Sequence, residues 1–335
     1  MYILGLNVYH GDSSACIYKD GELLCAFEEE RFTRKKHWAG FPVLAIRACL
    51  KEAGINIDQV EYITTSRNPK EHFLKKAFHA VRYQTSIYSV YQRLRNSAKV
   101  SSLEQEFATH FDVPASLIKS KIHNIEHHRS HLGSAFFASP YNESAILSID
   151  AFGDFCSTML GAGSGNKITV LDQVLFPHSI GMFYTAFTQY LGFMHYGDEY
   201  KVMGLAPYGK PDYIKEMQDV LMLEEDGLFK LNLDYFIHQK NGVTTRILED
   251  NDPTPSIVYS EKFKEIFGVA RKHSEPITEH HRNLAASIHK HCEEAIFHVL
   301  RKLHSLTGLD SVCIAGGVAQ NSVANGKITL NTPFK

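Results

Sequence analysis

The chain has 335 residues, of which 44% are hydrophobic, and a formal net charge of −2 at pH 7. Its length and apolar content allow one large core or two lobes, and they exclude a minimal binding module. A charge so close to zero provides no overall field that would attract nucleic acid or an anionic membrane. Composition therefore favours a two-lobed enzyme that acts on small or local partners.

The cysteines and the start of the chain predict a location in the cytoplasm. Six cysteines lie far apart without a CxxC pair, mostly inside apolar runs, as is typical of reduced core residues in a cytosolic protein. The opening segment MYILGLNVYHGD lacks the basic region of a signal peptide. No stretch approaches the roughly 18 apolar residues that a membrane-spanning helix needs. We expect a soluble, cytoplasmic protein without a membrane partner.

The first part of the chain predicts a β-meander followed by helices. Residues 2–9 have the pattern of a buried strand, and SACIYKDGELLCAFEEERF predicts two more strands around an Asp20-Gly21 turn. Further elements are expected as a strand at 60–65 and helices at about 42–53, 70–96 and 102–110. The basic stretch 70–99 is interpreted as a solvated helix face, with a phosphate-bearing partner as the alternative.

A second strand, acidic corner and strand follow at residues 144–164, SAILSIDAFGDFCSTMLGAG, with Asp150 and Asp154 in the corner. This repeats the N-terminal pattern, as a duplicated α/β nucleotide-binding lobe would, with the two loops facing each other across a cleft. Coincidence is the alternative, since two copies make a weak repeat. We expect a first lobe at 1–143, with a helical insertion at about 66–110, and a second lobe at 144–335.

The remaining chain predicts a helix, a loop, an excursion and a long helix. The segment GDEYKVMGLAPYGKP has the composition of a loop, and residues 239–258 that of an exposed excursion. Residues 283–304 form an amphipathic helix whose histidines lack metal spacing, so surface or packing roles are expected. The chain ends with a strand, a Gly316-Gly317 corner and a helix beginning near Gln320. It stops at the entrance to another strand, and we interpret it as a truncated fragment.

Three histidines in IEHHRSHLGSAFFA raise the question of a metal site. Residues four apart lie on one face of a helix, so His127 and His131 can point at one ion while His128 points elsewhere. Imidazoles suit zinc, iron or manganese, and Asp150 is the natural carboxylate to add. The alternatives are solvated imidazoles at a helix start and an aspartate that caps a turn.

The corner YHGDSSA combines backbone amides, hydroxyls, Asp12 and His10 between two strands. Such a corner can bind a phosphate through N–H groups, and His10 can act as a general acid or base because histidine titrates near neutrality. An ordinary hairpin turn explains the same residues.

Two glycine-containing segments could admit a flat ligand. In YKVMGLAPYG, Lys201 precedes a small-residue turn with Gly204, and in AGGVAQN a glycine corner opens a helix, as at nucleotide sites of α/β folds. Neither matches a Walker A or GxGxxG pattern. The segment 28–42, EEERFTRKKHWAGFP, alternates acid and base. One or two of its basic residues could bind a substrate phosphate, and most of its charges are expected to be solvated.

Together these blocks resemble the NodU/CmcH-type O-carbamoyltransferase family. The resemblance rests on LGLNVYHGDSSACIY, EEERFTRKKH, HHRSHLGSAFFAS, LSIDAFGD, SIGMFYTAFTQYLGF, DEYKVMGLAPYG and AGGVAQNSVANGKI, in order along the whole chain. It implies a duplicated actin/Hsp70/sugar-kinase-like α/β fold, the ASKHA fold, with two lobes around a cleft. It also implies carbamoyl transfer from carbamoyl-adenylate to a hydroxyl of a sugar-like or natural-product small molecule. In this family a C-terminal YrdC-like domain, absent here, makes the donor from carbamoyl phosphate and ATP.

The resemblance also implies roles for individual residues. His127, His131 and Asp150 match ligands of a divalent metal, expected to be Fe²⁺, whose further ligand lies beyond Lys335. His10 and Asp12 match the catalytic first loop. The adenylate side is matched by Lys201, Gly204, Gly316, Gly317 and Asn321. The chain departs from the family pattern at Ala151 and Asp154, which puts local geometry in doubt.

Three other interpretations compete with carbamoyl transfer. A kinase or ATPase of the same superfamily would hold Mg²⁺ between Asp12 and Asp150, but Mg²⁺ prefers oxygen ligands to histidines. A non-catalytic nucleotide-binding fragment and a tRNA-modifying protein are the others, and the charge gives no sign of RNA affinity. Acceptor and oligomeric state stay open, with a homodimer as one option.

Overall fold

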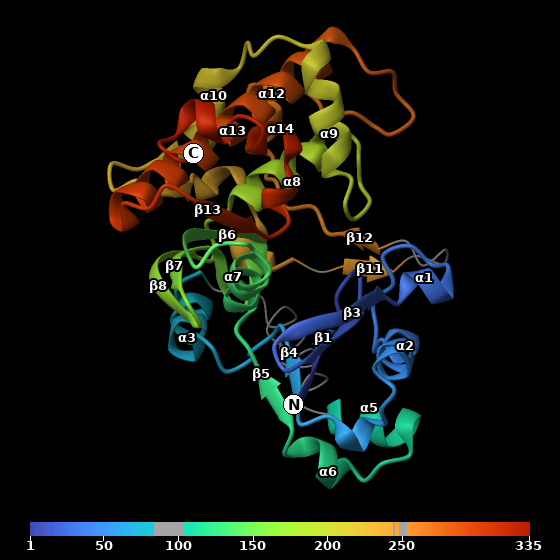
Figure 1. Ribbon diagram of the computed structural model, residues 1–335. Helices are drawn as coiled ribbons and strands as arrows, with labels where there is room; N and C mark the ends of the chain where they lie inside the picture. Colours follow the sequence, from blue (N-terminus) through green and yellow to red (C-terminus); the bar gives the residue numbers. More distant parts are fainter. Residues whose placement is uncertain (84–102, 244, 248–252) are drawn as a thin grey trace. The chain divides into compact units, whose positions relative to one another are not determined.

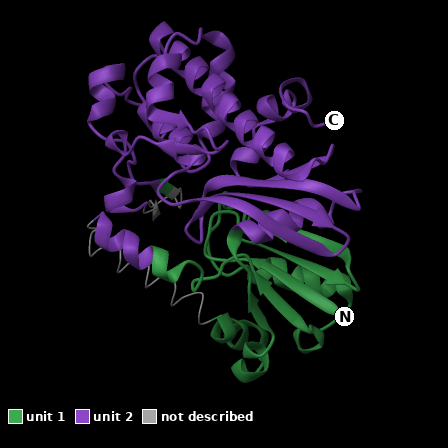
Figure 2. Ribbon diagram, turned by 90° about the vertical axis from the view of Figure 1, so that its left-hand side faces the viewer, with its two compact units in different colours: residues 1–75, 86–127, 245–254 green, residues 76–85, 128–244, 255–335 purple. Residues whose placement is uncertain are grey.

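Figure 1 shows a computed structural model of the chain, which describes residues 1–83, 103–243, 245–247 and 253–335. By internal packing the chain separates into two compact units, coloured in Figure 2. The first contains residues 1–75, 86–127 and 245–254, and the second contains 76–85, 128–244 and 255–335. The lobe boundary at residue 143 stays a prediction, and part of the predicted helix at 70–96 lies outside the described residues.

The first unit is built on a mixed sheet with the strand order β3-β2-β1-β4-β5. Its strands are β1 (Tyr2–Asn7), β2 (Ser14–Lys19), β3 (Glu22–Glu28), β4 (Tyr62–Thr65) and β5 (Ile122–Asn124). The first three are antiparallel, and β1, β4 and β5 are parallel. The predicted meander is therefore confirmed, with Asp20 and Gly21 both at positive φ in its turn. The edge strand β5 was not predicted.

Helices complete the core of the first unit. Helix α2 (Val43–Ala53) packs on β2 and β3 and buries Ala45, Ile46 and Cys49 against Leu4 and Ile17. The other helical segments in this part of the sequence are α1 (Glu30–Thr33), η1 (Ile57–Gln59), α3 (Phe73–Arg82), α5 (Leu103–Phe111) and α6 (Ala115–Lys119).

The second unit repeats this strand pattern. Its sheet has the order β13-β6-β7-β8, formed by β6 (Glu143–Gly153), β7 (Cys156–Ser164), β8 (Lys167–Leu175) and β13 (Val312–Ala315). As in the first unit, three consecutive strands are antiparallel and the fourth lies parallel to the first of them. Two copies of one α/β topology confirm the duplicated actin/Hsp70/sugar-kinase-like fold, while β8 itself was not predicted.

The two faces of this second sheet are covered by different helices. Alternate residues of β6 face opposite sides. Leu147 and Ile149 join the large core with α8 (Ile180–Tyr190) and α13 (Glu279–Thr307). Ile146 instead packs with Leu132 and Phe136 of α7 (His127–Phe137). The strand thus lies between α7 on one face and α8 with α13 on the other.

Glycine in β7 lets α7 approach the sheet closely. A Cβ atom on Gly163 would lie 2.6 Å from the ring of Phe136, and one on Gly161 would lie 3.2 Å from a methyl group of Leu132. Both contacts are tighter than ordinary packing, so larger residues would push the helix outward. Because Gly161 and Gly163 have no side chains, α7 can therefore lie close to the strands.

The remaining elements surround these sheets. They are α9 (Glu199–Leu205), η2 (Ala206–Tyr208), α10 (Ile214–Val220), β9 (Leu221–Leu223), β10 (Phe229–Leu231), η3 (Leu233–Tyr235), α11 (His238–Asn241), β11 (Thr245–Ile247), β12 (Pro253–Pro255), α12 (Lys262–Phe267), η4 (Val318–Gln320), α14 (Ser322–Asn325) and α15 (Ile328–Asn331). In the described part of the chain, no helix has the length and apolar character needed to cross a membrane.

Several local predictions were wrong. The segment predicted as a loop at GDEYKVMGLAPYGKP forms α9 and η2, because Val202 and Ala206 are buried and tertiary packing outweighs the glycines. The excursion at 239–258 is not exposed at its ends, where Gln239 and Val258 are buried. By contrast, the helix expected near Gln320 is present as α14, which begins at Ser322 and is short.

A buried carboxylate caps α2 from outside the helix. Pro42 precedes the helix and provides no side-chain cap. Glu29, only 2% exposed, instead accepts hydrogen bonds from the backbone N–H groups of Leu44 (3.1 Å) and Ala45 (2.7 Å). A carboxylate also interacts favourably with the positive end of the helix dipole. Glu29 therefore ties the end of β3 to the start of α2.

We predict that Glu29→Ala lowers the free energy of unfolding by about 2–4 kcal/mol, because two buried N–H groups lose their acceptor. Glu29→Gln, which keeps one acceptor oxygen, should cost less. The control is Glu28→Ala, which removes an exposed ion pair with Arg31 and should cost about 0–1 kcal/mol. Urea unfolding measures all three, and equal values for the two Ala variants would contradict the capping role.

Candidate functional site

Helix α7 and strand β6 bring together the three predicted metal ligands. His127 is the first residue of α7, and His131 follows one turn later on the same face. Asp150 lies near the end of β6. One ligand-type atom from each of the three residues lies within 4.8 Å of the others, and all three side chains are half-buried.

Two contacts define the geometry of this group. Nε2 of His131 lies 3.3 Å from Oδ2 of Asp150, whose other oxygen accepts a 2.7 Å hydrogen bond from the N–H of Ala151. Nδ1 of His127 lies 3.3 Å from the carbonyl oxygen of Ser66, to which it can only donate. In the neutral form of His127, the lone pair that could bind a metal is then on Nε2.

The chemistry of the donor set fits a transition metal. Two imidazole nitrogens and a carboxylate suit iron, zinc or manganese, whereas Mg²⁺ and Ca²⁺ prefer oxygen ligands. Ligands about 2.1 Å from a tetrahedral metal lie roughly 3.4 Å apart, close to the separation of the His131 and Asp150 atoms. The separation of the His131 and Asp150 atoms therefore matches that of two ligands on one metal, with a ligand-type atom of His127 within 4.8 Å of both.

His128 has a different role. It is fully buried, and its Nδ1 lies 2.7 Å from the hydroxyl of Ser148 on β6. It does not belong to the group of ligand-type atoms formed by His127, His131 and Asp150, although its ring lies edge-on to that of His131, with 6.0 Å between the ring centroids. Its contact with Ser148 fixes the start of α7 against β6.

The backbone around Asp150 is held by the start of α8. The hydroxyl of Ser179 caps this helix by accepting a hydrogen bond from the N–H of Met182 (3.1 Å), and it donates to the carbonyl oxygen of Asp150 (3.1 Å). Gly181 allows this close approach, because a Cβ atom there would lie 2.7 Å from Cα of Ala151. A serine before an apolar helix was a usable sequence signal for this residue, and it was missed.

The glycine corner after β13 lies directly beside Asp150. Gly316 has φ = 102°, and a Cβ atom on it would lie 2.3 Å from the carbonyl oxygen of Ile149. A Cβ atom on Gly317 would lie 2.9 Å from Oδ1 of Asp150. Of these two predicted adenylate residues, Gly316 thus lies against the backbone of β6 and Gly317 lies beside the carboxylate of Asp150.

The other three predicted adenylate residues occupy helical segments. Lys201 lies on α9, 31% exposed, and its ammonium pairs with Asp198 at 2.6 Å. Gly204 lies on the same helix, with open space around the position of a Cβ atom. Asn321 caps α14 by accepting a hydrogen bond from the N–H of Ala324 (3.1 Å).

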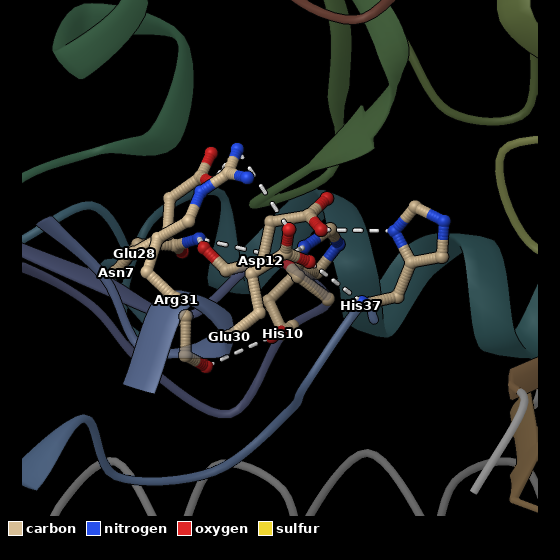
Figure 3. Close-up of polar contacts among 9 residues, drawn as sticks. Asn7, His10, Asp12, Glu28, Glu30, Arg31 and His37 are labelled. Carbon is tan, nitrogen blue, oxygen red and sulfur yellow. Dashed lines mark hydrogen bonds and ion pairs between the residues drawn. The ribbon is translucent and has the colours of Figure 1, made fainter. Parts of the chain in front are cut away.

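In the first unit, the corner between β1 and β2 makes a second polar cluster (Figure 3). The carboxylate of Asp12 contacts Nδ1 of His37 at 2.9 Å, and Glu30 accepts a 3.0 Å hydrogen bond from the N–H of His37. His10 is exposed, with Nδ1 3.1 Å from the carbonyl oxygen of Gly11. The family resemblance assigns His10 and Asp12 to the catalytic first loop, and the structure shows the carboxylate of Asp12 in contact with His37.

Asp12, Glu30 and His37 also have ligand-type atoms within 4.8 Å of one another. Both carboxylates, however, already interact with donors on His37, and the guanidinium of Arg31 lies 3.8 Å from Glu30. We therefore interpret this group as a hydrogen-bonded cluster. Sequence reasoning treated His37 as one of the charged residues of RKKH and did not link it to Asp12, because no spacing connects the two positions.

Comparison with known proteins gives one family match along nearly the whole chain. The family described as Carbamoyltransferase N-terminus matches residues 2–335.

Two relatives and one solved structure illustrate the similarity. An uncharacterized protein of Synechocystis is 38% identical over 100% of this chain and 53% of its own length. The nodulation protein NolNO of Sinorhizobium fredii is 32% identical over 98% of this chain and 44% of its own. The chain therefore spans about half the length of these curated relatives. The solved structure is that of component A of the (R)-2-hydroxyglutaryl-CoA dehydratase of Acidaminococcus fermentans. Its alignment covers 100% of this chain and 91% of the dehydratase component, with 13% identity and a TM-score of 0.44.

We predict that the purified protein, equilibrated with Fe²⁺ under anaerobic conditions and desalted, retains about one metal per chain. His127→Ala, His131→Ala and Asp150→Asn should each lose it, because each removes one of few ligands. His123→Ala, an exposed histidine of β5, is the control and should bind as the wild type does. Elemental mass spectrometry gives the metal content. Retention of the metal by all three ligand variants would contradict the site.

Proposed function

The chain belongs to the family of carbamoyltransferase N-terminal domains, and on that premise we propose that it transfers a carbamoyl group from carbamoyl-adenylate to a hydroxyl of a sugar-like or natural-product small molecule. The family match over residues 2–335 is the observation that carries this proposal. The histidine pair, the carboxylate and the glycine corner described above support it.

The donor is proposed to come from a separate activity. Carbamoyl phosphate and ATP give carbamoyl-adenylate, a mixed anhydride, in a YrdC-like domain. The length of the relatives, about twice that of this chain, is compatible with such an additional domain. A mixed anhydride is already activated, so the present chain needs to bind it, orient it and exclude water.

His127, His131 and Asp150 are the proposed ligands of the metal, which we take to be Fe²⁺. When bound, the metal supplies a Lewis acid that polarises the carbamoyl carbonyl oxygen. The fold fixes the positions of these ligands, because α7 packs closely on glycines of β7 and the carbonyl oxygen of Asp150 accepts a hydrogen bond from Ser179.

The glycine corner is the proposed approach path of the adenylate in the second unit. Without side chains at Gly316 and Gly317, a flat or phosphorylated group can approach the backbone beside Asp150. We retain Lys201, Gly204 and Asn321 as proposed adenylate contacts. The half-buried ammonium of Lys201 is held in place by Asp198 and could neutralise a phosphate oxygen.

The first-unit corner is the proposed site of proton transfer. An acceptor hydroxyl must lose its proton as its oxygen attacks the carbamoyl carbon, and His10 and Asp12 are the residues assigned to this task by the family resemblance. The hydroxyl compound is the proposed small-molecule partner.

The test supplies the protein, together with a YrdC-like domain that makes the donor, with carbamoyl-labelled [¹⁴C]carbamoyl phosphate, ATP and a panel of sugars and hydroxylated natural products. We expect label in one acceptor class and one AMP for each carbamoyl group transferred. His131→Ala should reduce the rate about 100-fold or more, since Lewis-acid assistance is worth several kcal/mol. His123→Ala is again the control. ADP formation with phosphorylation of the acceptor, and no labelled product, would show a kinase instead.

A further inference from the structure

We propose that His37 is the residue that accepts the proton of the acceptor hydroxyl, and that Asp12 is its positioning residue. This inference rests on the proposed carbamoyl transfer and refines its proton-transfer step. In this version of the step His10 forms hydrogen bonds and does not accept the proton. The contact between residues 12 and 37 is known only from the structure, because their spacing in the sequence does not predict it.

The Asp12–His37 contact selects the reactive nitrogen. An ionised carboxylate can only accept, so Nδ1 of His37, 2.9 Å from Oδ1 of Asp12, carries the hydrogen. In the neutral imidazole the lone pair then lies on Nε2. A carboxylate on Nδ1 also stabilises the imidazolium that forms when Nε2 takes up a proton, as in catalytic triads. Figure 3 shows the two side chains directed at each other.

The backbone holds both residues in place. The N–H of Ser13 donates to the carbonyl oxygen of Trp38 (3.1 Å), and the N–H of Tyr9 donates to that of Gly40 (3.0 Å). The fully buried hydroxyl of Ser13 lies within hydrogen-bond distance of both the N–H and the carbonyl oxygen of Gly40. These bonds join the corner after β1 to the segment that carries His37, so the dyad is preorganised.

Both members of the dyad have left-handed backbones. Asp12 has φ = 64° and His37 has φ = 54°, a region that costs free energy for residues other than glycine. The N–H of His37 donates to Glu30, which helps to hold this conformation. Strained residues persist where the surrounding structure fixes them, and they concentrate at functional sites.

Other side chains of the corner are less suited to accept a proton. Burial, together with the hydrogen bond to Glu106, raises the pKa of Tyr9, so its phenol stays neutral and acts as a donor. His10 is exposed, and its Nδ1 faces the carbonyl oxygen of Gly11. The side chain of His37 is 24% exposed, which combines access for a hydroxyl with partial shielding from water.

The acceptor O–H bond breaks and its proton moves to Nε2 of His37, while the acceptor oxygen forms a bond to the carbamoyl carbon. The bond between that carbon and the phosphate oxygen of carbamoyl-adenylate breaks, and AMP leaves with the electron pair. His37 then releases the proton to solvent, which regenerates the neutral imidazole.

The first experiment compares transfer rates of the intact protein with saturating acceptor. His37→Gly and His37→Gln should lower kcat about 10²- to 10⁴-fold, the range for loss of a general base. Added imidazole should restore part of the rate of the glycine variant, which a merely structural role would not allow. His123→Gln, the matched control, should keep the wild-type rate, and circular dichroism should show that all variants are folded.

The second experiment reads the tautomer without any turnover. In protein labelled with ¹⁵N-histidine, the His37 signals, assigned by their loss in His37→Gln, should show hydrogen on Nδ1. Asp12→Asn places an amide that can donate to Nδ1, so the hydrogen should move toward Nε2 and kcat should fall.

Each outcome has a definite meaning. A kcat within twofold of wild type for His37→Gln, or a reduced kcat that imidazole leaves unchanged in His37→Gly, overturns the inference while carbamoyl transfer stands. A wild-type His37 with hydrogen on Nε2 overturns it as well. If the His37 variants do not fold, Asp12→Asn provides the test. An unchanged tautomer of His37 and an unchanged kcat in that variant overturn the inference. No carbamoyl transfer by the wild type would overturn the proposed function itself, and this inference with it.

Discussion

The close packing of α7 on the glycines of β7 is the constraint on which the candidate metal centre depends. Phe136 and Leu132 occupy the space that side chains on Gly163 and Gly161 would fill, and they fix the helix at a short distance from the sheet. His127 and His131 are carried by the same helix, and Asp150 by the strand next to β7. A metal site needs its ligands placed to within a fraction of an ångström, and here ordinary core packing provides that placement.

A similar principle operates in the first unit, with hydrogen bonds in place of apolar packing. Asp12 and His37 come from two irregular segments, which by themselves would be mobile. Buried Ser13 joins these segments, while Glu29 anchors the end of β3 to α2 next to them in sequence. Buried polar groups of this kind are costly unless fully satisfied, so they specify one arrangement of the corner. The strained backbones of the dyad are the cost of that arrangement.

Much of the fold could be predicted from the sequence because its signals are local. The meander around Asp20-Gly21, the repeated strand pattern at 144–164 and the long amphipathic helix all follow from periodicity and turn chemistry. The helical spacing of His127 and His131 is equally local. The helical segments α9 and η2 were missed because the glycines and prolines of GDEYKVMGLAPYGKP are typical of a loop and outweighed the buried residues in the sequence pattern. The contacts of Asp12 with His37 and of Gly317 with Asp150 could not be predicted, since they depend on tertiary structure alone.

The measurement that tests the central claim most directly is X-ray absorption spectroscopy at the iron edge of the anaerobically loaded protein. The account predicts a first shell of nitrogen and oxygen atoms at about 2.0–2.2 Å, with the outer-shell scattering of two imidazoles and a carboxylate. It also predicts that His131→Ala removes one imidazole from that signal. A shell of oxygen atoms alone, unchanged in His131→Ala, would show that the metal binds elsewhere and would contradict the account.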